Sequence, residues 1–532
     1  MRTTPPPLDY YRRMVTGLHQ YLGTPLPADL GALLREQLER REERFLDSVG
    51  RTIFANSDNP YHPMFRWAGC SYEDLAEAVR RDGIESTLCR LHGEGVRLSH
   101  DEFKGKVPIR RAWGEMPGGP LRFRNPFAGG GLESRSSGSR SGSTGTSRSP
   151  RHRIHQLAYQ NLCLREFDLG RRRRIQVKYV LPAGDGISGC INYAHLGLPV
   201  DRWFAPGAAS ADSAHYRLAT NLLVVMARLR GVKVPFPSHL PPNDFTPVAE
   251  WIARRRREGS DCVVGAHVSP AVRIASAAAE GGFDIHGTLF LSGGEALTAA
   301  KQQAIEAAGC EVFPRYHISE IGPIGYGCRR MSSGNCVHLF HDSVAVIPHR
   351  RAAPFSDAEV GSLLFTTLLP NAPYVLINAE MDDSGVLEPA RCDCVFSAAG
   401  FRTAIRGIFS FGKLTGQGVT LVGTDIVQLL EEVLPCSFGG SPTDYQLVER
   451  ETGTQTGLVL RVSPRAGRPS PEEVKNRFLA EIRRFEGGAS ASRIWKSTEA
   501  LEVVIAEPIS TPTGKVLPLH LLGLEGTTSH EA

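Results

Sequence analysis

Residues 288–320 read TLFLSGGEALTAAKQQAIEAAGCEVFPRYHISE, and this stretch decides the fold. Its apolar start predicts a short strand that ends in Ser-Gly-Gly-Glu, because apolar runs of about four to eight residues bounded by glycine are typical of buried strands. Thr298 can then cap a helix over 299–308, and the next strand begins at Glu311. A similar alternation runs from residue 175 to 340, so we expect an α/β fold for the larger part of the chain.

The pattern changes near residue 411. Three short apolar runs are expected to be strands: 444–448, 458–462 and 501–506. Between the last two, Ser470 followed by Pro471 predicts the start of a helix. These elements form a small α+β unit. Since 532 residues are too many for one compact core, we expect two domains, at 1–411 and 412–532.

The composition, 41% hydrophobic and 22% charged, is that of an ordinary globular protein, and the net charge of +5 is slight for this length. Two arginine runs, at 171–174 and 254–257, have no interleaved aromatic residues that would stack on bases. We therefore interpret both runs as solvated helix or loop faces and expect no nucleic-acid partner.

Targeting signals are not recognisable. No apolar run reaches the roughly 18 residues that a membrane span needs, and residues 1–11 contain a proline cluster rather than the apolar core of a signal peptide. Eleven scattered cysteines do not suggest a disulfide framework. We expect a cytoplasmic protein without a membrane span.

A polar tract at 134–151 contains Ser-Gly-Ser-Thr-Gly at its centre. These five residues are Ser141, Gly142, Ser143, Thr144 and Gly145. Glycines let backbone N–H groups converge on a phosphate, and the hydroxyl groups add donors. The tract is not a Walker A loop, because no Gly-Lys-Ser/Thr follows the spaced glycines. A plain flexible linker is the alternative interpretation.

Two further turns carry groups suited to a nucleotide. Gly294 and Glu295 follow a strand, so their backbone can lie flat against a planar base; an ordinary βα turn is the alternative. In the next motif Tyr316 offers a stacking face, Ser319 a hydroxyl and Glu320 an oxygen ligand for Mg²⁺. A half-buried turn with a solvated glutamate is the alternative there.

Lys515 ends a Thr-Gly-Lys turn close to the C-terminus. A single lysine in a polar turn is usually a solvated surface residue. A flexible ammonium group that reaches a developing negative charge is nonetheless what chemistry at phosphorus requires.

These four motifs, in this order, resemble those of the adenylate-forming superfamily of acyl-CoA synthetases and related ligases, most closely its phenylacetate–CoA ligase-like branch. The resemblance runs from about residue 140 to the C-terminus. It implies a large N-terminal α/β domain with layered sheets and helices, and a small mobile α+β domain that carries Lys515. It also implies an enzyme that uses ATP and Mg²⁺ to convert a small carboxylic acid into its acyl-adenylate, with release of pyrophosphate. The acyl group would then pass to a thiol, either CoA or the phosphopantetheine of an acyl or peptidyl carrier protein.

The resemblance also implies roles for individual residues. Ser143 and Thr144, within the loop 141–145, would hold the phosphates of ATP. Glu295, next to Gly294, would line the adenine, on which Tyr316 would stack. The catalytic group would comprise Ser319 at the α-phosphate, Glu320 with Mg²⁺, and Lys515 between the carboxylate and the ribose–phosphate oxygens.

The sequence departs from the family pattern at two places. Glu380 stands where the family has the aspartate of Thr-Gly-Asp that grips the ribose, and Lys413 stands where the hinge has an arginine followed by acidic residues. Arginine and lysine differ where bidentate contacts matter. The altered hinge leaves two alternatives open: an adenylating enzyme with an amine or protein acceptor, and a degenerate nucleotide-binding or scaffold protein. A homodimer is also left open.

Cys328, His338, Cys392 and Cys394 form a candidate structural zinc site, because a Cys-x-Cys pair with a distant cysteine and histidine can complete a tetrahedral shell. Members of the same branch carry similar cysteines around this segment. Cys336 and His341 are competing ligands, and ordinary buried thiols are the alternative.

The residues that select the acid are harder to place. We expect the pocket to draw on residues 203–236 and 264–269. His317 stands where the family usually has a small residue, so it either extends into the carboxylate pocket and favours a polar substrate or simply packs.

Overall fold

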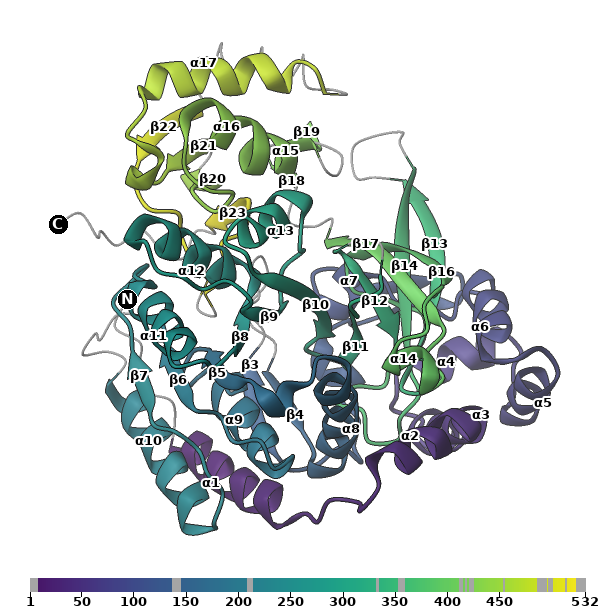
Figure 1. Cartoon of the computed structure of the whole chain (residues 1–532). Coiled ribbons are helices and arrows are strands. Elements are labelled where there is room, and N and C mark those ends of the chain that lie inside the picture. Colours follow the sequence, from purple (N-terminus) through teal and green to yellow (C-terminus); the bar gives the residue numbers. More distant parts are fainter. Residues whose placement is uncertain are drawn as a thin grey trace.

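A computed structural model of the chain describes residues 8–135, 145–207, 214–331, 334–352, 359–410, 415–416, 419–420, 425–452, 455–485, 495, 501–511 and 514–522 (Figure 1). One large mixed sheet forms the body of the molecule, and a smaller sheet made by the C-terminal part lies beside it. The α/β fold expected from the sequence, with a smaller C-terminal α+β unit, is confirmed. The boundary at residue 411 stays a prediction.

Ten of the described strands form the large sheet, in the order β16-β17-β12-β11-β10-β9-β8-β5-β6-β7. From β10 to β7 neighbouring strands are parallel, and from β10 to β16 they are antiparallel. The strands are β5 (Arg173–Val177), β6 (Arg202–Ala205), β7 (Pro237–His239), β8 (Cys262–His267), β9 (Leu289–Gly293), β10 (Glu311–Ile318), β11 (Gly322–Tyr326), β12 (Cys336–Leu339), β16 (Asp383–Pro389) and β17 (Thr403–Ser410).

Helices cover both faces of the parallel half, because its strands are apolar on both sides. Leu289 and Leu291 of β9 pack in one buried cluster with residues of α8 (Pro150–Glu166), α9 (Asp185–His195) and α10 (Ala214–Leu229). Phe290, between them, packs in another cluster with α11 (Thr246–Arg257) and α12 (Val268–Gly281). Successive side chains of a strand point to opposite faces, so an uninterrupted apolar run is buried on both.

The βαβ unit predicted over residues 288–320 is confirmed. β9 and β10 are parallel neighbours joined by α13 (Ala299–Glu306), and the Thr298 hydroxyl caps this helix by accepting the N–H of Lys301 at 3.4 Å. One detail was wrong: Tyr316 does not lie in a turn after the strand, because β10 continues to Ile318.

Smaller sheets and helices surround the large sheet. The remaining N-terminal strands are β1 (Ile109–Arg111) with β2 (Gly114–Met116), β3 (Leu132–Arg135) with β4 (Gly145–Arg148), and β13 (Val344–Ala352) with β14 (Glu359–Thr367) and β15 (Ala379–Glu380). The helices are α1 (Leu8–Gly23), α2 (Leu30–Glu39), α3 (Arg41–Val49), η1 (Gly50–Phe54), α4 (Tyr61–Trp67), α5 (Tyr72–Asp82), α6 (Ile84–Gly93), α7 (His100–Lys104), η2 (Pro120–Phe123), η3 (Leu169–Arg171) and α14 (Val395–Ala398). An apolar core joins α3 to α7, with η1 and η2, to β13 and β14.

The C-terminal part forms a four-stranded sheet in the order β22-β21-β20-β23. Its elements are β18 (Thr415–Gly416), β19 (Val419–Thr420), α15 (Asp425–Gln428), η6 (Leu429–Val433), α16 (Leu434–Phe438), β20 (Tyr445–Thr452), β21 (Gln455–Val462), η7 (Pro464–Ala466), α17 (Pro471–Ile482), β22 (Leu501–Ile505) and β23 (Leu519–Leu522). The predicted strands and helix are confirmed, and Val474, Phe478 and Ile482 of α17 are buried together. The Ser470 side chain precedes α17 but caps none of its N–H groups.

Two local predictions were wrong. The amphipathic pattern over residues 27–49 predicts one helix, whereas α2 ends before Arg40, whose φ of −104° and ψ of 22° are not helical. The apolar run 177–181 predicts a strand, whereas the strand of this segment is β5 at Arg173–Val177. Its first two residues are arginines, so the start of the strand does not show the apolar pattern from which strands are predicted.

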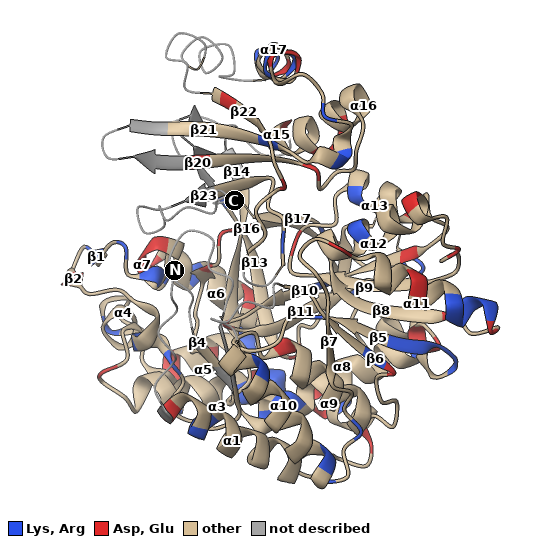
Figure 2. Ribbon diagram, turned by 90° about the vertical axis from the view of Figure 1, so that its left-hand side faces the viewer, with Lys and Arg blue, Asp and Glu red and all other residues tan. Residues whose placement is uncertain are grey.

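The arginine runs are engaged with acidic side chains. Arg256, in the last turn of α11, pairs with Asp284 at 2.7 Å, and Arg173 pairs with Asp201 at 3.2 Å. Figure 2 shows the basic end of α11 projecting from the fold. Cations at a helix C-terminus are stabilised by the helix dipole, so the run at 254–257 has a structural explanation. No helix within the described ranges is both long and apolar enough to cross a bilayer.

A buried ion pair joins the C-terminal part to the βαβ unit. Lys301 of α13 lies 2.8 Å from Glu431 of η6, and their side chains are only 3% and 2% exposed. Thr298 donates its hydroxyl to the same carboxylate at 2.5 Å. Because the attraction of Glu431 outweighs the effect of burial, the pKa of Lys301 is raised.

Replacing one partner of this pair strands the other charge in a buried position. We expect Lys301→Met to lower the free energy of unfolding by about 3–5 kcal/mol, measured by urea unfolding. The double variant Lys301→Met, Glu431→Leu should recover most of that loss, and Lys233→Met, at an exposed lysine, is the control. A single variant as stable as the control would contradict the role of the pair.

Candidate active site

A cavity opens at the edge of the large sheet where three parallel strands end. In the sheet register His267 of β8 lies opposite Gly293 of β9, and Gly293 lies opposite Arg315 of β10. The cavity has a volume of about 220 Å³, and α8, α9, the ends of these strands and the C-terminal tail form its walls. Open α/β sheets bind ligands at this edge, so the cavity is the candidate active site.

Three of the predicted site residues line this cavity: Gly294, Ser319 and Lys515. Of the two segments expected to form the acid pocket, 264–269 contributes to the wall, whereas none of the described residues of 203–236 does. The sequence motifs therefore locate the cavity, but they locate its walls only in part.

A tight turn brings Lys515 to the cavity. Thr511 accepts the N–H of Gly514 through its carbonyl oxygen at 2.7 Å and the N–H of Lys515 through its hydroxyl at 3.1 Å. Gly514 has φ +80°, and a Cβ there would lie 2.2 Å from the ring of Tyr179. Glycine is therefore required twice, for the backbone conformation and for the close approach to Tyr179.

Ser269 is hydrogen-bonded to Val516, the residue that follows Lys515. Its hydroxyl accepts the N–H of Val516 at 3.2 Å and donates to the carboxylate of Glu295, which also accepts the Ser269 N–H at 3.2 Å. Glu295, expected to line an adenine, thus takes part in holding the tail at the first turn of α12. Its contact with a nucleotide stays a prediction.

The floor of the cavity carries several basic groups around one carboxylate. Lys178 lies 3.2 Å from Asp185, and His267 is hydrogen-bonded through Nδ1 to the carbonyl oxygen of Gly293 at 3.0 Å. Burial, with the ammonium groups of Lys178 and Lys515, lowers the pKa of His267 to about 3. The imidazole is therefore neutral at physiological pH, and the positive charge of this wall resides on the two lysines.

Alternate residues of the β10 segment face opposite sides. Arg315, His317 and Ser319 line the cavity. Tyr316, between them, donates its hydroxyl to Asp383 at 2.7 Å, and its ring meets Phe365 edge-on. The Tyr316 ring therefore lies on the side of the strand that faces away from the cavity. Stacking of this ring on a nucleotide base stays a prediction.

Glu320 is buried and paired with Lys104 of α7 at 2.9 Å. Mg²⁺ is usually held by one or two carboxylates together with phosphate oxygens of a substrate. Glu320 offers a suitable carboxylate, but Lys104 already engages one of its oxygens. Mg²⁺ fits here only if it takes the other oxygen or displaces that ammonium group.

The other predicted nucleotide-binding residues are distributed differently. Ser141, Gly142, Ser143, Thr144 and Lys413 lie outside the described residues. Gly145 begins β4, which pairs with β3, so paired strands flank the Ser/Gly/Thr loop, and α8 follows directly. Glu380 lies in β15, where its N–H binds the carbonyl oxygen of Leu98 at 2.8 Å, and it does not line the cavity.

Sequence reasoning missed most of the polar lining. Gln156 and Gln160 of α8, Asn192 of α9 and Arg315 of β10 all face the cavity. One signal was present: two glutamines four residues apart on a largely buried helix share a face, and a polar face on such a helix needs partners or a ligand.

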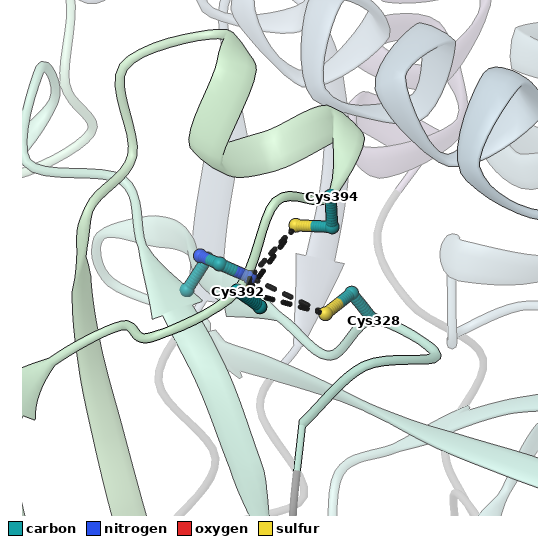
Figure 3. A group of neighbouring side chains, drawn as sticks. Cys328, Cys392 and Cys394 are labelled. Carbon is teal, nitrogen blue, oxygen red and sulfur yellow. Dashed lines mark hydrogen bonds between the residues drawn. The ribbon is translucent and has the colours of Figure 1, made fainter.

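A second cluster lies away from the cavity. Cys328, His338, Cys392 and Cys394 come together as predicted, with their ligand atoms within 4.8 Å of one another (Figure 3). The Sγ atom of Cys392 lies 3.8 Å from that of Cys328 and 3.7 Å from that of Cys394. These distances match the edge of a tetrahedron with Zn–S bonds of about 2.3 Å, which is about 3.8 Å.

The histidine of this cluster is oriented for metal binding. His338 directs Nε2 to the three sulfur atoms, at 3.1–3.4 Å. Its Nδ1 lies 2.8 Å from the carbonyl oxygen of Phe401, which fixes the ring as second partners of zinc ligands commonly do. The four residues could hold a zinc ion, and the competing ligands Cys336 and His341 are not part of the cluster.

Comparisons with known proteins give structural matches only. No family model and no curated protein matches the sequence. An acyl-CoA synthetase (AMP-forming)/AMP-acid ligase II-like protein from Dyadobacter fermentans is 16% identical, with 72% of this chain and 87% of that chain aligned and a TM-score of 0.28. Apo MatB from Rhodopseudomonas palustris is 13% identical over 72% and 66% of the chains, with a TM-score of 0.31. The GH3.15 acyl acid amido synthetase is 9% identical over 88% and 86%, with a TM-score of 0.42. Identities and TM-scores this low report a likeness of structure alone, and no family, branch or reaction follows from them.

The metal cluster predicts the composition of the purified protein. We expect about one zinc ion per chain by elemental analysis, and its loss in Cys394→Ala together with a lower unfolding temperature, because a structural zinc site stabilises the fold that forms it. Cys436→Ala, at an exposed cysteine, is the control. A metal-free wild-type protein, or identical behaviour of the two variants, would count against the site.

Proposed function

We propose that this protein is an ATP-dependent ligase that joins a small carboxylic acid to AMP and releases pyrophosphate. One observation carries the proposal: Lys515 of the C-terminal tail lies in a cavity at the carboxyl ends of β9 and β10, beside Gly294 and Ser319. Separate sequence motifs contribute all three residues, and the proposed reaction needs them in one place.

The reaction is an in-line attack of a carboxylate oxygen on the α-phosphorus of ATP, with pyrophosphate as the leaving group. Both reactants are anions, so they approach only where positive charge offsets their repulsion. Lys515 supplies such a charge, and Ser319 supplies a hydroxyl for the α-phosphate. A preorganised charge of this kind typically contributes about 10²–10³ in rate.

The nucleotide contacts belong to the same proposal. The loop 141–145 would hold the phosphates, Glu295 and Tyr316 the adenine, and Glu380 with Lys413 the ribose side. Mg²⁺ would be held by Glu320 and would neutralise phosphate charge. Since Lys104 now pairs with that carboxylate, binding of the metal would release this lysine or share Glu320 with it.

For the second step we propose transfer of the acyl group to a thiol, CoA or a carrier-protein phosphopantetheine, as in the phenylacetate–CoA ligase-like branch. The unit 412–532 would act as the mobile lid. Transfer to an amine or protein is the second candidate, favoured by the lysine in place of the hinge arginine at position 413. Consumption of free CoA thiol after adenylation separates the two.

Carboxylate-dependent exchange of pyrophosphate into ATP tests the first step. We expect Lys515→Ala to reduce exchange by about 10²–10³-fold and to leave the dissociation constant of ATP nearly unchanged, because the lysine acts on charge that develops in the reaction. Lys233→Ala is the matched control at an exposed site.

Exchange that survives in Lys515→Ala would remove the lysine from this role. A wild-type protein that binds ATP but exchanges pyrophosphate with no acid, across aryl, fatty, amino, hydroxy and dicarboxylic acids, would favour the scaffold interpretation instead.

A further inference from the structure

The cavity contains a guanidinium group that the proposed adenylation step does not use. Arg315 projects from β10, with Nη2 3.5 Å from the hydroxyl of Tyr193 and the guanidinium carbon 5.1 Å from the centre of the Tyr326 ring. Its Nε is buried and has no hydrogen-bond partner among the described residues. Among the described residues, no carboxylate oxygen lies within 4.0 Å of the guanidinium nitrogen atoms of Arg315.

Such a charge is costly unless an anion accompanies it. A cation partly removed from water without an anionic partner is destabilised, and the contacts of Arg315 with the Tyr193 hydroxyl, the Cys163 thiol and the Tyr326 ring offset only a part of that cost. Arg315 lines a cavity rather than a packed core. A ligand anion can therefore supply the missing partner, and a guanidinium group is well shaped for a carboxylate.

Amide groups on the facing walls point to the same kind of ligand. Gln156 is 7% exposed and Gln176 5% exposed. Gln156 Nε2 and Gln160 Oε1 are buried without hydrogen-bond partners in the described structure. Gly265 lies opposite Gln176 in the sheet, and a Cβ there would come within 2.8 Å of its Nε2, so the glycine makes room for this amide.

The cavity is also small and unusually polar for a ligand site. Ligand pockets commonly measure about 300–1,000 Å³ and are mostly apolar, whereas this one measures about 220 Å³ and has two lysines, an arginine, an aspartate and three glutamines in its walls. A fatty chain would leave these groups unpaired. A small ligand with polar groups at both ends would not.

We infer that the acid bound in this cavity is a small dicarboxylic acid, one carboxylate reacting beside Lys515 and Ser319 and the other bound by Arg315 with the glutamine amides. The two cationic side chains lie at different walls of the cavity. The Lys515 side chain lies next to Gly294, whereas the Arg315 guanidinium group lies near Tyr193 of α9. This inference rests on the proposed function and adds the class of substrate to it. Arg315 is then a specificity-determining residue.

Three acids of nearly equal length provide the test: glutarate, its monoamide glutaramate and valerate. In pyrophosphate exchange we expect kcat/KM for glutarate to exceed that for either of the others by about 10- to 100-fold, the usual effect of one hydrogen-bonded charge. Arg315→Met should lower the value for glutarate by a similar factor and leave valerate within about threefold. Arg315→Lys should lie between the two, and Arg110→Met, at an exposed arginine, is the control.

The outcomes separate the inference from the function beneath it. If wild-type protein uses valerate or glutaramate as well as glutarate, or if folded Arg315→Met loses activity equally with all three acids, the dicarboxylate inference is wrong and adenylation stands. If no acid of the broader screen supports exchange, the proposed function itself fails. Binding of glutarate alone, followed by calorimetry with wild type and Arg315→Lys, should weaken in the variant; equal affinities would also overturn the inference.

Discussion

The position of Lys515 depends on one hydrogen-bonded link between the C-terminal tail and the large sheet. Ser269 donates its hydroxyl to Glu295 and accepts the N–H of Val516 with the same oxygen, which a hydroxyl can do because it has one donor and two lone pairs. Glu295 lies two residues after the end of β9, so the link fixes the tail at the strand end where the cavity opens. The buried pair of Lys301 and Glu431 fixes the rest of the C-terminal part to the helix after the same strand. Both ties therefore converge on one βαβ unit.

This arrangement determines the electrostatics of the cavity. His267 stays neutral because it is buried between two ammonium groups, and the carboxylate of Asp185 balances Lys178. Lys515 and Arg315 also line the cavity, where both can contact an anionic ligand. In a partly enclosed cavity such charges interact more strongly with an anion than at a fully exposed surface. The proposed binding of an anionic substrate would thus depend on where the tail docks and on the Arg315 side chain of β10.

Patterns among neighbouring residues were sufficient to predict much of the fold and part of the candidate site. The strand, cap and helix over residues 288–320 follow from neighbouring residues. The proximity of Cys392 and Cys394 also follows, because they are two residues apart in one loop. Which residues of the β10 segment face the cavity could not be predicted from the motif. A motif gives only the order of its residues, whereas in the structure Tyr316 and Ser319 lie on opposite sides. Lys104 was equally invisible as the partner of Glu320, since they lie far apart in sequence and no local pattern joins them. The break at Arg40 was missed because a helical pattern continues across it.

The candidate metal cluster adjoins β11, the strand whose Tyr326 lines the cavity, so a bound ion would lie close to the proposed substrate site in the sheet. Tyr326 of β11 carries the guanidinium group of Arg315 on its ring and is hydrogen-bonded to His317 at 3.0 Å. It lies opposite His338 in the sheet register, and Cys328 follows two residues later. A zinc ion that joins His338 to Cys328 would therefore restrain both neighbours of Tyr326. Binding groups select well only when their supports are rigid, so the ion would act on the cavity through the geometry of β11 and would need no contact with the substrate.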